Sequence, residues 1–232
     1  MEPIPPAKNN TMLLWTLAAF IILFIIAVII ILIVSLSRSH TPAAPAQKMG
    51  VASSSAVGGP SPGVAFLGIP LTGKQIIFSL DGSSANLNSF NLLAADVKQT
   101  VAKLSAGHEI KFALWTPHGL TLLPRQGWIT PLHATGAEHT LLNYSPYGST
   151  SAAKAMRETL KLGGDQIIFV TAKVFLSKSD LPAQIAKLRT PGQHIDVISV
   201  NGERKELQQL AKQSAGQFRF VTISDLQNAM AQ

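Results

Sequence analysis

The 232-residue chain contains no cysteine, so it can form neither disulfide bonds nor thiolate-ligated metal sites. Charged residues make up only 13% of it, and the basic excess behind the formal net charge of +7 is scattered along the sequence. Proteins that bind nucleic acid gather basic residues into patches, often between aromatic side chains. The composition therefore argues against a nucleic-acid partner.

The chain also lacks the short motifs of common enzyme classes. It contains neither the Gly-x-Ser-x-Gly turn of hydrolases nor the glycine-rich loop, closed by Lys and Ser or Thr, that binds phosphates. The histidines do not show the i, i+4 pairing of common helical zinc sites; those weighed for this role are His118, His133, His139 and His194. We therefore expect the protein not to be an enzyme.

What the chain does contain is a long apolar run near its start. Residues 12–36 include no charged residue and are rich in isoleucine. About 20 apolar residues span the core of a bilayer as a helix, so we predict a transmembrane helix over 12–36. The alternative is a secretory signal cleaved at Ala44-Pro45-Ala46, although the apolar core of such signals is usually only about 7–15 residues long.

Polar segments flank this run on both sides. Residues 1–11 are short, polar and contain proline, which predicts a disordered tail. Residues 37–69 are rich in Ala, Pro, Ser and Gly, as in flexible linkers. Basic residues are similar in number on the two sides, so they do not determine the orientation. The apolar run predicts a single-pass protein of the plasma or inner membrane, and the long polar segment favours an extracytoplasmic position of the domain.

From residue 70 to residue 232, apolar runs of strand length alternate with segments of helical periodicity. This alternation predicts one α/β domain, a Rossmann-like three-layer sandwich with a mostly parallel sheet and helices on both faces. Residues 109–123 instead predict a hairpin that adds one antiparallel strand. Residues 124–148 are less regular and hold three large aromatic side chains, which belong either to the core or to an interface: Trp128, Tyr144 and Tyr147.

The apolar run 75–80 ends in Asp81-Gly82-Ser83-Ser84. A run this short, bounded by turn residues, predicts a strand buried on both faces. Open α/β sheets place their ligand sites at the carboxyl ends of such strands. Two further polar segments should reach the same edge, Gly148-Ser149-Thr150 before a helix and Thr171-Ala172-Lys173 after a strand. The sequence thus gathers three polar loops at one edge of the sheet.

These segments together resemble the von Willebrand factor type A domain over roughly residues 73–230. That family opens with a hydrophobic strand ending in Asp-x-Ser-x-Ser, which the residues from Asp81 match in part. Its Gly-Gly-Thr before a helix is similar to Gly148-Ser149-Thr150, and its strand ending in Thr-Asp-Gly is similar to Thr171-Ala172-Lys173. The other similar segments are 111–115, 120–124, 196–200, 206–211 and 216–221.

The resemblance implies ligand binding through a metal-ion-dependent adhesion site (MIDAS), which usually holds magnesium. Asp81, Ser83 and Thr150 match ligand positions, whereas Ala85 and Ala172 stand where the family has a second serine and an aspartate. Magnesium demands near-octahedral oxygen ligation, and Lys173 adds repulsion beside the vacant aspartate position. We therefore expect no bound metal and no other cofactor, with weak magnesium binding on the same three residues as the alternative. Without a metal, Asp81 and Ser83 would hydrogen-bond to amides of the loop and of a helix terminus.

These features together predict a membrane-anchored protein-interaction module, an adhesion or scaffold domain that binds a protein partner near the membrane without depending on a metal. Binding would use the edge near Asp81, Ser83 and Thr150, or the irregular segment with its aromatic residues, since aromatic residues favour interfaces. The first alternative is metal-dependent adhesion. The second is a hydrolase, although a phosphatase of the haloacid dehalogenase type would need an aspartate in place of Ser83.

Overall fold

The computed structural model describes residues 63–173, 181–202 and 204–230. The tail 1–11, the apolar segment 12–36 and most of the linker 37–69 lie outside these residues, so what is expected of them stays a prediction. In the described ranges, no helix combines the length and the apolar character that crossing a bilayer requires.

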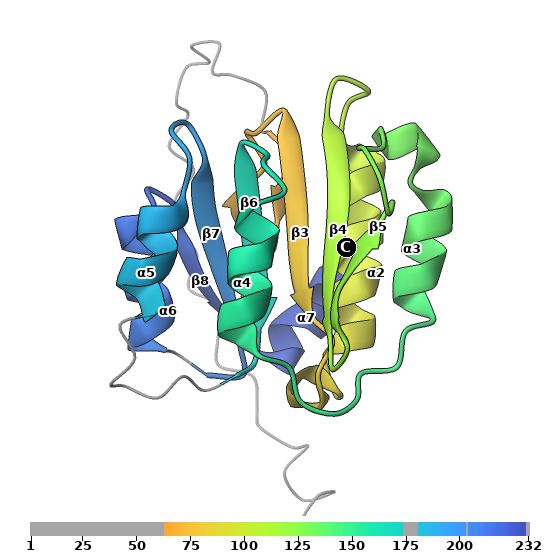
Figure 1. The fold of residues 1–232 in the computed structure, drawn as a ribbon. Coiled ribbons are helices and arrows are strands. Elements are labelled where there is room, and N and C mark those ends of the chain that lie inside the picture. The colour runs from red at the N-terminus through yellow and green to blue at the C-terminus, as the bar shows by residue number, and fades with distance from the viewer. Residues whose placement is uncertain (1–62, 174–180, 203, 231–232) are drawn as a thin grey trace, which may run out of the picture. The chain divides into compact units, whose positions relative to one another are not determined.

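A six-stranded sheet forms the centre of the domain (Figure 1). Its strand order is β5-β4-β3-β6-β7-β8. Every neighbouring pair is parallel except β4 and β5, which form the expected hairpin. The prediction of a mostly parallel sheet with one antiparallel strand is therefore confirmed. The strands are β3 (Gln75–Asp81), β4 (Glu109–Thr116), β5 (Gly119–Leu123), β6 (Gln166–Thr171), β7 (His194–Val200) and β8 (Phe218–Val221).

Helices cover both faces of the sheet, so the predicted three layers are present. Buried residues of α2, α3 and α7 join the core on one face, and those of α4, α5 and α6 join the core on the other. Figure 1 shows α4 and α5 in front of the sheet. The helices are α2 (Phe90–Lys103), α3 (Thr135–Leu142), α4 (Ala152–Leu160), α5 (Leu181–Leu188), α6 (Lys205–Gln213) and α7 (Ile223–Met230).

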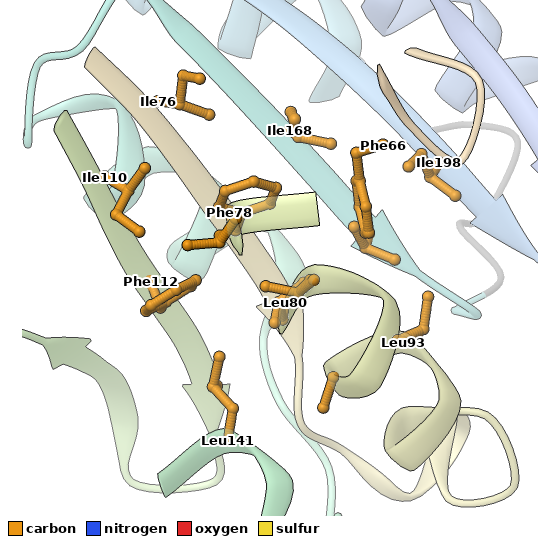
Figure 2. Packing of buried hydrophobic residues seen from close by; sticks show 14 of the residues in the cluster. Phe66, Ile76, Phe78, Leu80, Leu93, Ile110, Phe112, Leu141, Ile168 and Ile198 are labelled. Carbon is orange, nitrogen blue, oxygen red and sulfur yellow. The ribbon is translucent and has the colours of Figure 1, made fainter. Parts of the chain in front are cut away.

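Strand β3 is apolar on both faces because it packs against both helical layers. Phe78 belongs to the core under α2, where its ring centroid lies 5.3 Å from that of Phe66 and 5.8 Å from that of Phe112 (Figure 2). Ile77, its neighbour in sequence, belongs to the core on the opposite face. Burial on both faces holds β3 in the middle of the sheet and thereby positions the polar residues at its carboxyl end.

A short hairpin precedes the sheet where the linker was expected to continue. Strand β1 (Ala65–Phe66) pairs with β2 (Ile69–Pro70), and both Phe66 and Ile69 are buried. Between them, Leu67 and Gly68 have φ values of 49° and 81°, as two-residue hairpin turns require. The folded domain therefore begins before residue 70, and the predicted linker end at residue 69 is too late. Local composition could not reveal that Phe66 is covered by β3.

The segment 124–148, expected to be less regular, contains helix α3. A single 3-10 turn over Pro131–His133 leads into it, and Leu141 is fully buried in the core beside α2. The helix is short and includes Gly136, a poor helix former. Its sequence therefore carries little helical signal, and packing against α2 stabilises it instead.

Candidate functional site

The carboxyl ends of β3, β4 and β6 meet at one edge of the sheet. Asp81 pairs with Trp115 of β4, and Leu80 pairs with Val170 of β6, so Asp81 and Thr171 end neighbouring strands. The amino terminus of α4 follows directly after Thr150 and Ser151. We call the group formed here by Asp81, Ser83, Thr150, Thr171 and Lys173 the rim.

The Asp81 carboxylate is fully buried and accepts three hydrogen bonds. Its Oδ1 accepts from the Ser83 amide at 3.1 Å and from the Thr150 hydroxyl at 3.2 Å. Its Oδ2 accepts from the Thr171 hydroxyl at 2.7 Å. The structure therefore brings together the three residues singled out in the sequence, Asp81, Ser83 and Thr150. Their role in binding stays a prediction.

The Ser83 hydroxyl is the unsatisfied group of the rim. Ser83 is 1% exposed, and its Oγ has no hydrogen-bond partner among the described residues. Leaving a buried polar group unpaired costs about 1–3 kcal/mol. Without a metal, the Asp81 and Ser83 side chains were expected to hydrogen-bond to backbone amides. The Asp81 side chain does so, because it accepts from the Ser83 amide. The Ser83 hydroxyl does not.

Two residues of the rim, Thr171 and Lys173, were not among the binding residues predicted from the sequence. Thr171 supplies the shortest hydrogen bond to Asp81. The Lys173 Nζ donates to the Thr150 carbonyl oxygen at 2.6 Å, and its backbone amide donates to the Thr171 hydroxyl at 3.0 Å. Both belong to the tripeptide at the end of β6, which sequence reasoning treated mainly as a vacant ligand position. The signal available was a polar residue at the end of a buried strand, Thr171, followed two positions later by Lys173.

Close packing behind the rim requires glycine at position 82. The Gly82 amide donates to the Trp115 carbonyl oxygen at 2.9 Å, and its own carbonyl accepts from the Tyr144 hydroxyl at 3.0 Å and the Tyr147 amide at 3.2 Å. A Cβ at this position would lie 2.7 Å from a ring carbon of Tyr144 and 2.8 Å from the Trp115 carbonyl oxygen. Gly82 therefore ties the segment around Tyr144 to the end of β3.

The three aromatic residues of the segment 124–148 have different environments. Tyr144 is half-buried with its ring centroid 5.3 Å from that of Phe90, and burial, with Tyr147 and Asp81 nearby, raises its pKa. Tyr147 is 47% exposed, and its centroid lies 6.4 Å from that of Tyr144. Trp128 packs on the core beneath the Lys111 ammonium, which lies 5.2 Å from its ring centroid. Tyr147 is therefore the aromatic side chain beside the rim that a partner could contact.

A pocket of about 340 Å³ adjoins the rim. It lies between the turn of the β4–β5 hairpin, including Pro117 and His118, and the first turns of α4, including Thr150 and Lys154. The His118 ring centroid lies 6.3 Å from that of Tyr147, so Tyr147 lies near a residue that lines the pocket.

The donor set of the rim is poor for a resident magnesium ion, which prefers octahedral oxygen ligation. The rim offers one carboxylate, and both of its oxygens already accept hydrogen bonds from protein donors. Positions 85 and 172 are alanine, and the Lys173 ammonium brings a positive charge to the Thr150 carbonyl. The unpaired Ser83 hydroxyl is the feature that would suit a metal ligand. Elsewhere in the described residues, no cluster of three His, Asp or Glu side chains could hold a metal ion.

Neither a protein-family model nor a curated protein matches the sequence. A solved von Willebrand factor type A structure from Catenulispora acidiphila matches with a TM-score of 0.55 and 15% identity over 70% of this chain and 42% of its own. Proximal thread matrix protein 1 from the mussel byssus, with a zinc-occupied MIDAS motif, matches with a TM-score of 0.51 and 17% identity, over 68% and 46% of the two chains. The pilus adhesin SpaC from Lactobacillus rhamnosus GG matches with a TM-score of 0.52 and 8% identity, over 69% and 30%.

This chain spans less than half the length of each of these three proteins. At such low identities the likeness concerns the fold and leaves activity and partners open. The described domain has a six-stranded sheet with one antiparallel edge strand and polar loops at its carboxyl edge. The described domain therefore has the von Willebrand factor type A fold.

Proposed function

We propose that this protein is a membrane-anchored interaction module whose rim binds a protein partner without depending on a metal. The observation that carries the proposal is the Lys173 side chain, whose ammonium is bonded to the Thr150 carbonyl. A positive group in this place disfavours a resident cation through like-charge repulsion. The adhesive and matrix proteins that share the fold support a role in binding.

A binding role is also supported by the chemistry that the rim offers. The Asp81 carboxylate is buried and both of its oxygens accept from neutral donors, which suits a structural role better than proton transfer. The described residues around it include no histidine or cysteine in hydrogen-bonding contact with Ser83 or Thr150 that would activate either hydroxyl. We therefore propose an interaction module in preference to a hydrolase.

The membrane part of the proposal rests on the sequence of residues 12–36, which are uncharged and long enough to span a bilayer. The segment between this run and the hairpin β1–β2 would then act as a flexible linker. Such an arrangement would present the rim to partners in or near the plasma or inner membrane, with the domain on the extracytoplasmic side.

The proposal is tested by photo-crosslinking in intact membranes. A photoreactive phenylalanine analogue replaces Tyr147 beside the rim in the full-length protein, and a second variant carries it at Gln126, which is exposed in the loop after β5. We expect a discrete crosslinked protein from position 147 in the presence of EDTA and none from position 126. Capture that is equal at the two positions, or that EDTA abolishes, would contradict metal-independent binding at the rim.

The unpaired Ser83 hydroxyl favours one second candidate, metal-dependent adhesion. In that case a partner carboxylate would complete the coordination shell of a magnesium ion on Asp81, Ser83 and Thr150. Titration calorimetry with magnesium or manganese, with and without an acidic peptide, separates the two candidates. Metal binding that is lost in Asp81→Ala would support the second, whereas peptide binding that survives in EDTA would support the first.

A further inference from the structure

We infer that the Lys173 ammonium is the positive group through which the rim binds its partner, and that it binds a carboxylate side chain. The inference rests on the proposed function, because it assigns the chemistry of the same site. Its basis is the geometry of Lys173, the charges near the rim and the exposed aromatic side chain beside it.

Lys173 is held in place at both ends. Its backbone amide donates to the Thr171 hydroxyl at 3.0 Å, and its Nζ donates to the Thr150 carbonyl oxygen at 2.6 Å. The side chain therefore bridges the end of β6 and the start of α4, and it stays partly exposed. An ammonium group has three N–H donors, and the Thr150 carbonyl is the one acceptor that it has among the described residues. The remaining donors can serve a ligand.

The Lys173 ammonium forms no ion pair with Asp81, the one carboxylate of the rim. Asp81 is fully buried, and its oxygens accept from Ser83, Thr150 and Thr171. Within the part of the chain that the structure describes, Lys173 forms no ion pair with a carboxylate. An external carboxylate would supply the counter-charge, and a charge-assisted hydrogen bond is stronger than one between neutral groups.

The surroundings of Lys173 also favour a negatively charged ligand. The amino terminus of α4, which carries partial positive charge, begins at Ala152 directly after Thr150 and Ser151. Lys154 is exposed and lines the adjoining pocket. Glu158, the acidic residue of that pocket, already forms a salt bridge of 2.9 Å with Lys161. Among the described residues Lys154 forms no salt bridge, so its ammonium places a positive charge on this side of the pocket.

Features of size and polarity favour a protein side chain over a free small anion. Tyr147 is 47% exposed and its ring centroid lies 6.3 Å from that of His118, which lines the pocket together with Thr150, so an exposed aromatic side chain lies close to the pocket. The pocket of about 340 Å³ has room for a neighbouring side chain of the partner. Exposed aromatic groups of this kind are enriched at protein interfaces. An aspartate or glutamate next to an apolar residue would match both features.

The test uses the full-length protein in detergent with EDTA and a peptide whose single carboxylate is an aspartate side chain, acetyl-Gly-Leu-Asp-Gly-Gly-amide. Binding is followed by NMR through the amide signals of residues 149–154 and 171–173. We expect the peptide with Asn in place of Asp to bind about two- to fivefold more weakly, as loss of one partly exposed charge pair implies. Lys173→Met should weaken binding of the Asp peptide equally, whereas Lys173→Arg, which keeps the charge, should retain it.

Lys212→Met is the matched control, because it removes the same charge from an exposed position in the last turn of α6 and should leave binding unchanged. Equal binding of the two peptides, binding of neither, or unaltered binding by Lys173→Met would overturn the inference. Free acetate that binds as tightly as the peptide would overturn the assignment to a protein side chain.

Photo-crosslinking from position 147 separates failure of this inference from failure of the proposed function. Capture that Lys173→Met leaves intact would refute only the role of Lys173, and absence of capture would refute both.

Discussion

At the scale of single residues, the rim is built around one buried charge. Asp81 has no exposed surface, and a carboxyl group in such a place is tolerated because its oxygens accept hydrogen bonds. These donors come from residue 83 in the loop after β3, residue 150 before α4 and residue 171 at the end of β6. Asp81 therefore acts as the link that joins these three segments at the edge of the sheet, whatever ligand the rim binds.

Replacing Thr171 by valine tests this stabilising role. The substitution keeps the shape of the side chain and removes the donor that lies 2.7 Å from Asp81 Oδ2. We expect the free energy of unfolding to fall by about 1–3 kcal/mol, because a buried carboxylate oxygen is left short of a partner. Urea denaturation monitored by tryptophan fluorescence measures the change. Thr121→Val, at an exposed position of β5, should change the stability by less than about 0.5 kcal/mol, and equal effects of the two would disprove the role of Thr171.

A second residue-scale prediction concerns the metal. Ala172→Asp combined with Lys173→Gly adds a carboxylate to the rim and removes the competing ammonium. We expect this double variant to bind magnesium or manganese at least about tenfold more tightly than the natural chain, because affinity for hard cations rises with ligand charge. Titration calorimetry provides the measurement. The variant Ala172→Asn with Lys173→Gly is the uncharged control, and a natural chain that binds as tightly as the double variant would refute the argument.

At the scale of secondary-structure elements, polar side chains decide how strands and helices are joined. At the amino edge of the sheet, the buried Gln166 side chain accepts from the amides of Thr72 and Gly73 and donates to the Pro70 carbonyl and to Asp196. One side chain at the start of β6 thus connects the hairpin β1–β2 to the start of β7. Helix α7 begins with a reciprocal cap, in which the Thr222 amide donates to Asp225 and the Asp225 amide donates to the Thr222 hydroxyl.

Two aspartates on helices should respond to pH in opposite ways. Burial raises the pKa of Asp96 on α2, with Lys103 opposing the shift, and its buried Oδ2 has no hydrogen-bond partner among the described residues. The hydrogen bonds from the Thr222 amide and hydroxyl lower the pKa of Asp225 on α7. A raised folded-state pKa means that the ionised form destabilises the fold, and a lowered one means that it stabilises the fold.

We therefore expect Asp96→Asn to increase the free energy of unfolding at neutral pH and Asp225→Asn to decrease it. The gain from Asp96→Asn should shrink as the pH falls through the raised pKa toward the ordinary value of 3.8. The loss from Asp225→Asn should persist down to 3.8 and vanish only as the pH falls through the lowered pKa. Urea denaturation at a series of pH values measures both trends. Parallel trends for the two variants would contradict the assignment of opposite shifts.

At the scale of the whole molecule, the chain combines a folded α/β domain with an uncharged run over residues 12–36. If residues 12–36 are a permanent anchor, the mature protein differs from the one that remains if they are a cleaved signal. An anchored chain keeps its amino terminus and stays with the bilayer, whereas a cleaved one begins after Ala46 and leaves it.

Extraction of membranes with alkaline carbonate distinguishes these outcomes. We expect the full-length protein to remain in the membrane pellet and a variant that lacks residues 12–36 to appear in the supernatant. Mass spectrometry of the amino terminus checks that residues 1–46 are retained. Protease digestion of intact cells should remove the folded domain if it is extracytoplasmic. A soluble protein that begins after Ala46 would show that the run is a signal.

The sequence by itself determined the class of the fold, because apolar runs of strand length and helical periodicity report burial within a few residues along the chain. It also placed Asp81 after a buried central strand and Thr150 before a helix, which was enough to bring the two residues together. The hairpin β1–β2 and helix α3 escaped this reasoning. The burial of Phe66 and Leu141 depends on partners remote in sequence.

Only the tertiary structure decided the chemistry of the rim. The hydrogen bonds of Asp81 to Thr150 and Thr171 span 69 and 90 residues, and the contact of Lys173 with the Thr150 carbonyl spans 23. Such contacts follow from the register of β3 against β6 and from the position of α4, which periodicity does not encode. The same strand register that buries Asp81 brings Lys173 to the edge of the sheet, where its charge can meet a ligand.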